Sequence, residues 1–286
     1  MGKKGKKAQA GKPKKLTPKD VGKRMDTLIK KLEEELEGAD LFAPLPPTED
    51  CAICLVPLPR VVRNTTYNAC CGKIICNACS EENKAVSYQK KLTVHPCPFC
   101  RGKTPTNYEE GMRQLEARAA QNDHEAWDGL GENYRESKDD LKAIDCYIRA
   151  VDLGSPRAAA PLAEYCREGI VVARDLEKEA LFSRIGALRG SCSDRHNIGV
   201  LEYCDLGNHE IAIRHWKIAA EAGMQASLDA LKTIFNANGK QPGKEFVSKE
   251  YLDSVYRACH AAQEEVKSEE REKHGEHLDR LIKSKY

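Results

Sequence analysis

The sequence predicts a mainly α protein built from two unlike parts: a small unit held together by metal and, after it, a stack of helix pairs. Eight of the thirteen cysteines lie between residues 51 and 100, a density that is typical of a metal site in a chain without secretion signals. From about residue 107 the sequence is rich in alanine, has helical periodicity and repeats itself at intervals of 31 to 36 residues. Periods of this length indicate stacked structural repeats.

The composition argues against a membrane-spanning or a secreted protein. Charged residues make up 31% of the 286 positions, and no apolar run approaches the roughly 20 residues that span a bilayer. The first twenty residues contain no apolar stretch of the signal-peptide kind, and Lys6 stands where N-myristoylation needs Ser or Thr. We therefore expect a cytoplasmic or nuclear protein.

The chain begins with a basic segment. Residues 1–24 carry ten basic groups and one acidic group, and their Lys, Gly, Pro and Ala content predicts a disordered tail. Such a tail is most often only solvated, and nuclear import or nonspecific contact with nucleic acid is the alternative. Aromatic residues that could stack on bases are missing between the lysines, so specific nucleic-acid binding is not expected. Residues 25–49 predict a helix that stops at Gly38, followed by a stiff Pro-rich linker.

Residues 50–103 form the cysteine-rich unit. Its eight thiols are arranged as three Cys-x-x-Cys pairs and one doublet: Cys51 and Cys54, Cys70 and Cys71, Cys76 and Cys79, and Cys97 and Cys100. Structural zinc takes four nitrogen or sulfur ligands, so eight thiols predict two zinc ions. Because the unit has few apolar residues, we expect zinc to supply its folding energy. Closed four-thiolate sites leave no open coordination position, which argues against hydrolytic zinc chemistry.

The order of pair, loop, doublet, pair, loop and pair resembles that of the RING finger family. The segments that carry the resemblance are Cys51-Ala-Ile-Cys54, Cys71-Gly-Lys-Ile-Ile-Cys76 and Cys97-Pro-Phe-Cys100-Arg101. It implies a cross-brace of two interleaved zinc sites, one made by Cys51, Cys54, Cys76 and Cys79 and the other by Cys70, Cys71, Cys97 and Cys100. Many RING fingers have a histidine where this chain has Lys73, so Cys70 is expected to be the fourth ligand of the second site, with His95 as the alternative.

RING fingers of the ubiquitin system bind an E2 enzyme loaded with ubiquitin and hold it in a reactive geometry, with no covalent intermediate on the RING. The resemblance therefore implies an E3 ubiquitin ligase. Three positions match the E2-binding pattern: Ile53 as an apolar anchor, Pro98 in the second contact loop, and Arg101 as the linchpin that bonds both E2 and ubiquitin. Each also has a structural interpretation, respectively as a core residue, a turn former and a counter-charge to the thiolates.

A second function stays open, namely a non-catalytic zinc-binding scaffold or adaptor for protein–protein interaction. The helix expected after Cys79 lacks the tryptophan that many active RING fingers place there, so Val86 or Tyr88 would have to replace it.

Residues 107–262 are expected to form the helical repeat domain. Similar helix-closing stretches, in which the last residue supplies a left-handed C′ position, end at Asp123, Gly154, Gly190 and Gly223. These closures, and the loop from Gly169 to its expected helix cap Asp175, resemble Sel1-like repeats, which are relatives of the tetratricopeptide type. The resemblance implies an α-solenoid whose concave face binds a protein substrate or adaptor.

The remaining parts of the chain are expected to be structural. Apolar stripes in the repeats predict inter-helix core, and the isolated cysteines predict small buried hydrophobic residues: Cys146, Cys166, Cys192, Cys204 and Cys259. Residues 263–286 are highly charged and predict a solvated C-terminal tail.

Overall fold

The computed structural model describes residues 16–60, 65–90, 95–237 and 241–267. Helices dominate it, as the sequence predicts. Its two strands are β1 (Thr65–Asn68) and β2 (Lys73–Cys76). Its helices are α1 (Pro18–Leu36), α2 (Asn77–Gln89), α3 (Tyr108–Ala119), α4 (His124–Glu136), α5 (Asp140–Asp152), α6 (Ala159–Glu168), α7 (Leu176–Leu188), α8 (Cys192–Cys204), α9 (His209–Glu221), α10 (Gln225–Asn236), the short 3₁₀ helix η1 (Lys244–Phe246) and α11 (Lys249–Glu265).

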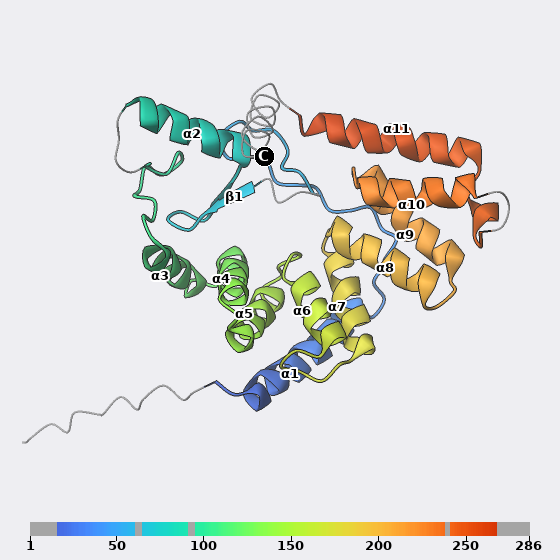
Figure 1. Ribbon diagram of the computed structural model, residues 1–286, viewed down its shortest axis with the longest axis horizontal. Coiled ribbons are helices and arrows are strands. Elements are labelled where there is room, and N and C mark those ends of the chain that lie inside the picture. Colours follow the sequence, from blue (N-terminus) through green and yellow to red (C-terminus); the bar gives the residue numbers. More distant parts are fainter. Residues whose placement is uncertain (1–15, 61–64, 91–94, 238–240, 268–286) are drawn as a thin grey trace, which may run out of the picture.

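The helices from α3 to α11 follow one another along an arc, which we call the helical array (Figure 1). Within it, α4 packs on α5, α6 on α7, and α8 on α9, so that consecutive antiparallel pairs are stacked. The cysteine-rich unit, with β1, β2 and α2, lies beside the first helices of the array (Figure 1). The predicted succession of a small unit and a stack of helix pairs is therefore present.

Left-handed glycines end the helices α5, α7 and α9, as predicted. Gly154, Gly190 and Gly223 have φ angles of 98°, 102° and 94°. The prediction is wrong at the first closure, where Asn122 has φ 61° and Asp123 is instead the N-cap residue of α4. Asparagine tolerates the left-handed region, which leaves the following aspartate in position to cap a helix.

A small residue facing an aromatic ring recurs inside the helix pairs. A Cβ added to Gly131 on α4 would lie 2.6 Å from the ring of Tyr147 on α5. A Cβ added to Gly199 on α8 would lie 2.5 Å from the indole nitrogen of Trp216 on α9. Two pairs far apart in the sequence thus use the same packing device, which supports true repeats.

Replacing Gly131 with alanine is therefore expected to lower the free energy of unfolding of the array by roughly 1–3 kcal/mol, because the ring of Tyr147 is fully buried and has to shift. Gly111→Ala on α3 is the matched control, since its Cβ would meet Pro105 at an ordinary 3.8 Å. This control should raise stability slightly through helix propensity. Denaturant unfolding of both variants checks the prediction, and equal effects of the two substitutions would contradict it.

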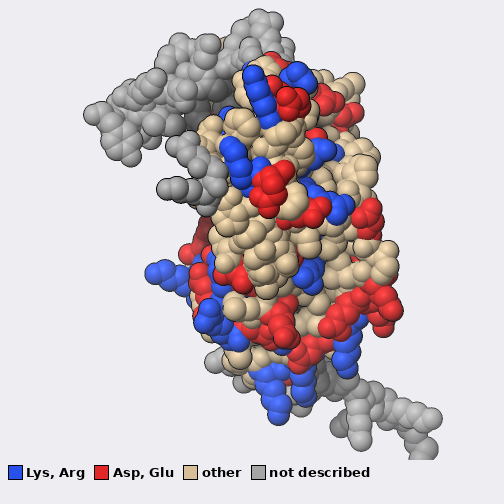
Figure 2. Space-filling view, turned by 90° about the vertical axis from the view of Figure 1, so that its right-hand side faces the viewer, with Lys and Arg blue, Asp and Glu red and all other residues tan. Residues whose placement is uncertain are grey.

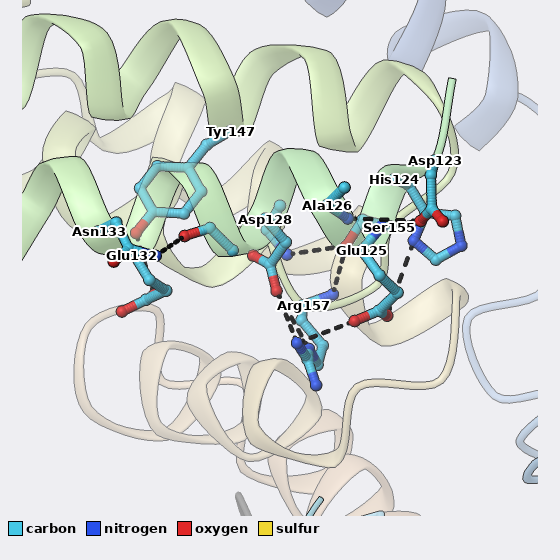
Figure 3. Close-up of polar contacts among 12 residues, drawn as sticks. Asp123, His124, Glu125, Ala126, Asp128, Glu132, Asn133, Tyr147, Ser155 and Arg157 are labelled. Atoms are coloured by element: carbon cyan, nitrogen blue, oxygen red, sulfur yellow. Dashed lines mark hydrogen bonds and ion pairs between the residues drawn. The ribbon is translucent and has the colours of Figure 1, made fainter. Parts of the chain in front are cut away.

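Arg157 ties the first pair of the array to the second (Figure 3). Its Nη2 lies 2.9 Å from Oε2 of Glu125 and 2.9 Å from Oδ2 of Asp128, and both acids belong to α4. Burial raises the pKa of Asp128, and the guanidinium of Arg157 opposes that rise. The ion pairs thus compensate two buried carboxylates at the junction of the repeats.

The N-terminal helix starts before the predicted boundary at residue 24 and packs on the array. α1 begins at Pro18 and buries Val21, Met25, Leu28 and Leu32 against α5 and α7. Its start is set by a capping box in which Thr17 and Asp20 bond each other's backbone amides. Residues 18–24 are therefore helical rather than part of a disordered tail, whereas residues 1–15 lie outside the described part of the chain. The stop expected at Gly38 is confirmed by its φ of 76°.

Most of the isolated cysteines behave as predicted. Cys146, Cys166, Cys192 and Cys259 are buried, but Cys204 at the end of α8 is exposed. Residues 263–265 belong to α11 instead of a tail, and residues 268–286 lie outside the described part.

No helix within the described ranges has both the length and the apolar character needed to cross a membrane. Over the face of the molecule seen in Figure 2, basic and acidic side chains are interspersed.

Candidate metal centre

Two loops of the cysteine-rich unit share one backbone geometry. In the first loop the amide of Leu55 donates to the carbonyl of Cys51 at 2.9 Å. In the second the amide of Arg101 donates to the carbonyl of Cys97 at 3.0 Å. Leu55 and Arg101 have φ angles of 58° and 63°, a conformation that is uncommon for residues with a side chain. Each loop thus turns tightly and directs its two cysteines to the same side.

A hairpin and a helix supply the other four cysteines. β1 and β2 are antiparallel, and the closing pair of Asn68 and Lys73 leaves a four-residue loop that carries Cys70 and Cys71. Strand β2 ends at Cys76, which is the N-cap residue of α2, and Cys79 lies in the first turn of that helix. Each cysteine pair is therefore placed by a well-defined local structure.

The structure brings the eight thiols together in two groups of four. In each group all sulfur atoms lie within 4.8 Å of one another. Group one consists of Cys51, Cys54, Cys76 and Cys79, and group two of Cys70, Cys71, Cys97 and Cys100. These are the two interleaved sets that the resemblance implies, and each can hold a metal ion.

The sulfur spacing suits tetrahedral zinc. A Zn–S bond of about 2.3 Å gives tetrahedral sulfurs a separation of about 3.8 Å. The sulfurs of Cys54 and Cys76 are 3.9 Å apart, and those of Cys71 and Cys97 are 3.8 Å apart. These separations are much longer than the roughly 2.05 Å of a disulfide. The donor set of four sulfurs is also the one that selects soft or borderline metals such as zinc over magnesium or calcium.

A bound cation would change the ionisation of the thiols in each group. Burial raises the pKa of the Cys70 thiol, and hydrogen bonds with the neighbouring cysteines raise it further. Cys79 behaves in the same way. At Cys51, burial acts to raise the pKa, but backbone amides including those of Cys54 and Cys76 donate to the sulfur and lower the pKa to about 7. Four thiolates within one small volume repel one another, and a bound dication removes that penalty.

The alternative ligand His95 is not part of either group. Its ring lies edge-on to the ring of Tyr88, with 4.6 Å between centroids. Cys70, whose sulfur lies 3.5 Å from that of Cys100, completes group two instead.

The three residues predicted to bind E2 lie on or beside the two matching loops. Ile53 is 41% exposed and is thus not a core residue, Arg101 is exposed, and Pro98 is half-buried. The apolar core of the unit is made by Leu58, Ile75 and Ala78 together with the cysteines themselves. Other large apolar side chains of the unit are also exposed: Leu55, Val86, Tyr88 and Phe99.

A contact between the hairpin and the array could not be predicted from the sequence. The hydroxyl of Tyr67 on β1 donates to Oδ2 of Asp123 at 2.7 Å, and Nη2 of Arg118 donates to the same oxygen at 2.6 Å. Tyr67 is 56 positions from Asp123, so no local pattern connects the hairpin to the array.

Comparisons with known proteins assign no family to the chain. A scan against protein-family models found no match, and neither did a search of curated proteins. Among solved structures the chain is similar to a Sel1 repeat protein from Oxalobacter formigenes, with 22% identity over 65% of this chain and 73% of that one and a TM-score of 0.47. It is also similar to the immunity protein PA5088 from Pseudomonas aeruginosa, with 14% identity over 71% of this chain and 84% of that one and a TM-score of 0.31.

Proposed function

We propose that this protein is a RING-type E3 ubiquitin ligase, whose cysteine-rich unit binds two zinc ions and an E2 enzyme loaded with ubiquitin. The observation that carries the proposal is the pair of interleaved four-cysteine groups, whose sulfurs all lie within 4.8 Å of one another. In this proposal the zinc ions are structural, since each has four sulfur ligands and no open position for a substrate. The ions supply folding energy, and the protein surface supplies the function.

The E2 surface would be formed by the two matching loops. Ile53 offers an exposed apolar side chain, which is typical of a binding anchor. Arg101 is exposed, and its guanidinium has five donors in a rigid fork, which suits it to bridging the carbonyl groups of two bound proteins. Pro98 would fix the shape of the second loop. Catalysis would come from holding the E2–ubiquitin thioester in an attack-ready orientation, a gain that requires no covalent bond to this chain.

The helical array would recruit the protein that receives ubiquitin. Stacked helix pairs form an extended surface, and Sel1-like solenoids of this kind bind partner proteins on the concave face. The contact of Tyr67 with Asp123 would then fix the E2-binding unit relative to the substrate-binding array.

Reconstitution of ubiquitin transfer tests the proposal. The protein is incubated with E1, a panel of E2 enzymes, ubiquitin and ATP, and chain formation is followed over time. Ile53→Ala and Arg101→Ala are each expected to slow the reaction roughly tenfold or more, which corresponds to the loss of about 1.4 kcal/mol of binding. Matched controls are Ile211→Ala on α9, which is similarly exposed, and Arg113→Ala on α3.

The outcomes separate the two functions. Activity that falls with Ile53→Ala and Arg101→Ala but not with the controls supports the ligase. No transfer with any E2, together with two bound zinc ions and retained partner binding, would instead identify a non-catalytic scaffold or adaptor.

A further inference from the structure

The loop that carries two cysteines of group two is short and rigidly joined to β1. The amides of Cys71 and Gly72 both donate to the carbonyl of Asn68, at 3.1 and 2.8 Å. Tyr67 directly precedes Asn68 on β1. Any force that orders Cys70 and Cys71 therefore also orders Tyr67 and Gly72.

Tyr67 is part of the core of the array as well as of the hairpin. Its ring packs against a buried cluster that includes Ala119 of α3 and Ala126 and Leu130 of α4. Its hydroxyl donates to Asp123 at 2.7 Å. Burial and this hydrogen bond raise the pKa of Tyr67, so it stays a neutral donor at physiological pH.

Asp123 has two tasks at this point (Figure 3 shows the helix end that it caps). Its Oδ1 accepts from the amides of Glu125 and Ala126 and so caps α4. Its Oδ2 accepts from Tyr67 and from Arg118 of α3. A single carboxylate thus joins the hairpin, the end of α3 and the start of α4.

Gly72 allows the cysteine loop to lie close to Arg118. Its φ is 70°, and a Cβ at this position would lie 2.0 Å from Nη2 of Arg118. The backbone of the cysteine loop therefore lies directly against the guanidinium that bonds Asp123.

From these contacts we propose that metal binding to group two is coupled to the packing of α3 and α4, through Tyr67, Gly72 and the Arg118–Asp123 ion pair. The inference rests on the metal binding proposed above. Bound metal clamps the loop between Cys70 and Gly72, which holds Tyr67 in the α3–α4 core. Loss of the metal frees the loop, and Asp123, which caps α4, then loses its contacts with Tyr67 and Arg118. Binding free energies are reciprocal, so weakening the contact also weakens metal binding to group two.

Hydrogen–deuterium exchange of the full chain, with and without metal, tests the forward direction. Zinc is removed with excess EDTA under reducing conditions, and its content is measured independently. Backbone amides between residues 115 and 130 are expected to exchange at least tenfold faster in the metal-free protein, while those of α8 and α9 keep their rate.

Competition for zinc with a colorimetric chelator at equilibrium tests the reverse direction. Tyr67→Phe and Asp123→Asn are each expected to weaken the binding of one of the two zinc ions about tenfold and to leave the other unchanged. The control for Asp123→Asn is Asp175→Asn, because Asp175 caps α7 in the same way but lies outside the contact. The control for Tyr67→Phe is Tyr203→Phe, which removes a hydroxyl bonded to Gln241. Asparagine is itself a good cap, so both aspartate variants should fold.

The outcomes distinguish this inference from the function on which it rests. A protein that binds no zinc overturns the metal sites themselves. A protein that binds two zinc ions, but whose α3 and α4 exchange equally fast with and without them, or whose variants bind zinc as tightly as the controls do, overturns only the coupling.

Discussion

Removing the metal, or one of its ligands, is expected to unfold the cysteine-rich unit while α5 to α11 stay folded. The unit has a core of only a few apolar side chains, Leu58, Ile75 and Ala78 among them. A structural zinc site contributes on the order of 10–16 kcal/mol, which is as large as the total stability of a typical domain. Cys97→Ser should therefore expose residues 50–103 to proteolysis, as should excess chelator on the unmodified protein.

The matched control is Cys204→Ser, since Cys204 is an exposed cysteine outside both groups. It should leave the digestion pattern unchanged. Limited proteolysis with mass-spectrometric mapping of the first cleavage sites measures the effect of both substitutions. If Cys97→Ser and Cys204→Ser were digested alike, the unit would not depend on metal for its fold.

The second large effect concerns Asp194, whose carboxyl group is fully buried near the start of α8. Burial raises its pKa from an ordinary 3.8 to about 7, and the nearby Ser191 opposes only part of that rise. The neighbouring Arg195 does not offset this, because its guanidinium donates to the carbonyls of Leu41 and Ala187. The folded protein thus holds a proton here that the unfolded chain releases.

Asp194→Asn is therefore expected to stabilise the array in a pH-dependent way. Below about pH 4 the carboxyl is protonated in both states, so the variant gains nothing. Between about pH 4 and pH 7 only the unfolded chain loses the proton, so the stability of the unmodified protein falls as the pH rises. The gain of the variant should reach about 2–4 kcal/mol at pH 8.

Denaturant unfolding at pH 4, 6 and 8 measures this gain. Asp229→Asn serves as the control, because the Asp229 side chain is 57% exposed on α10. A stability difference between Asp194→Asn and the unmodified protein that stays constant over this pH range would contradict the account of the buried carboxyl.

Features encoded by short-range patterns could be predicted from the sequence. The left-handed closures at Gly154, Gly190 and Gly223 follow from glycine at fixed places. The cap at Asp175 is likewise confirmed, because its carboxylate accepts from the amides of Glu177 and Lys178. Both depend only on residues close in the chain.

Features that depend on packing between distant residues could not be predicted. The stripe of Val21, Met25, Leu28 and Leu32 shows that α1 needs an apolar partner, but nothing in it identifies α5 and α7 as that partner. Helix α1 starts at Pro18, earlier than the basic composition before residue 24 suggests, because the capping box at Thr17 sets its first turn. No sequence pattern predicts the contact made by Tyr67, because its partner Asp123 is 56 residues away.

The candidate site shows the same division. The Cys-x-x-Cys spacing indicates which thiols share a loop, whereas their assembly into two groups depends on the fold of the hairpin and of α2. The resemblance to RING fingers supplied that assembly, and the structure brings the same two sets together. It stays a prediction that zinc occupies the two cysteine groups. It also stays a prediction that Ile53, Pro98 and Arg101 bind an E2.

We propose that two groups of four cysteines each bind one zinc ion. Zinc K-edge X-ray absorption, combined with elemental analysis of the purified full chain, tests this occupancy. We expect two zinc ions per chain and a first shell of four sulfur atoms at about 2.3 Å. A content near one or zero, or a shell that contains nitrogen from a residue such as His95, would contradict it.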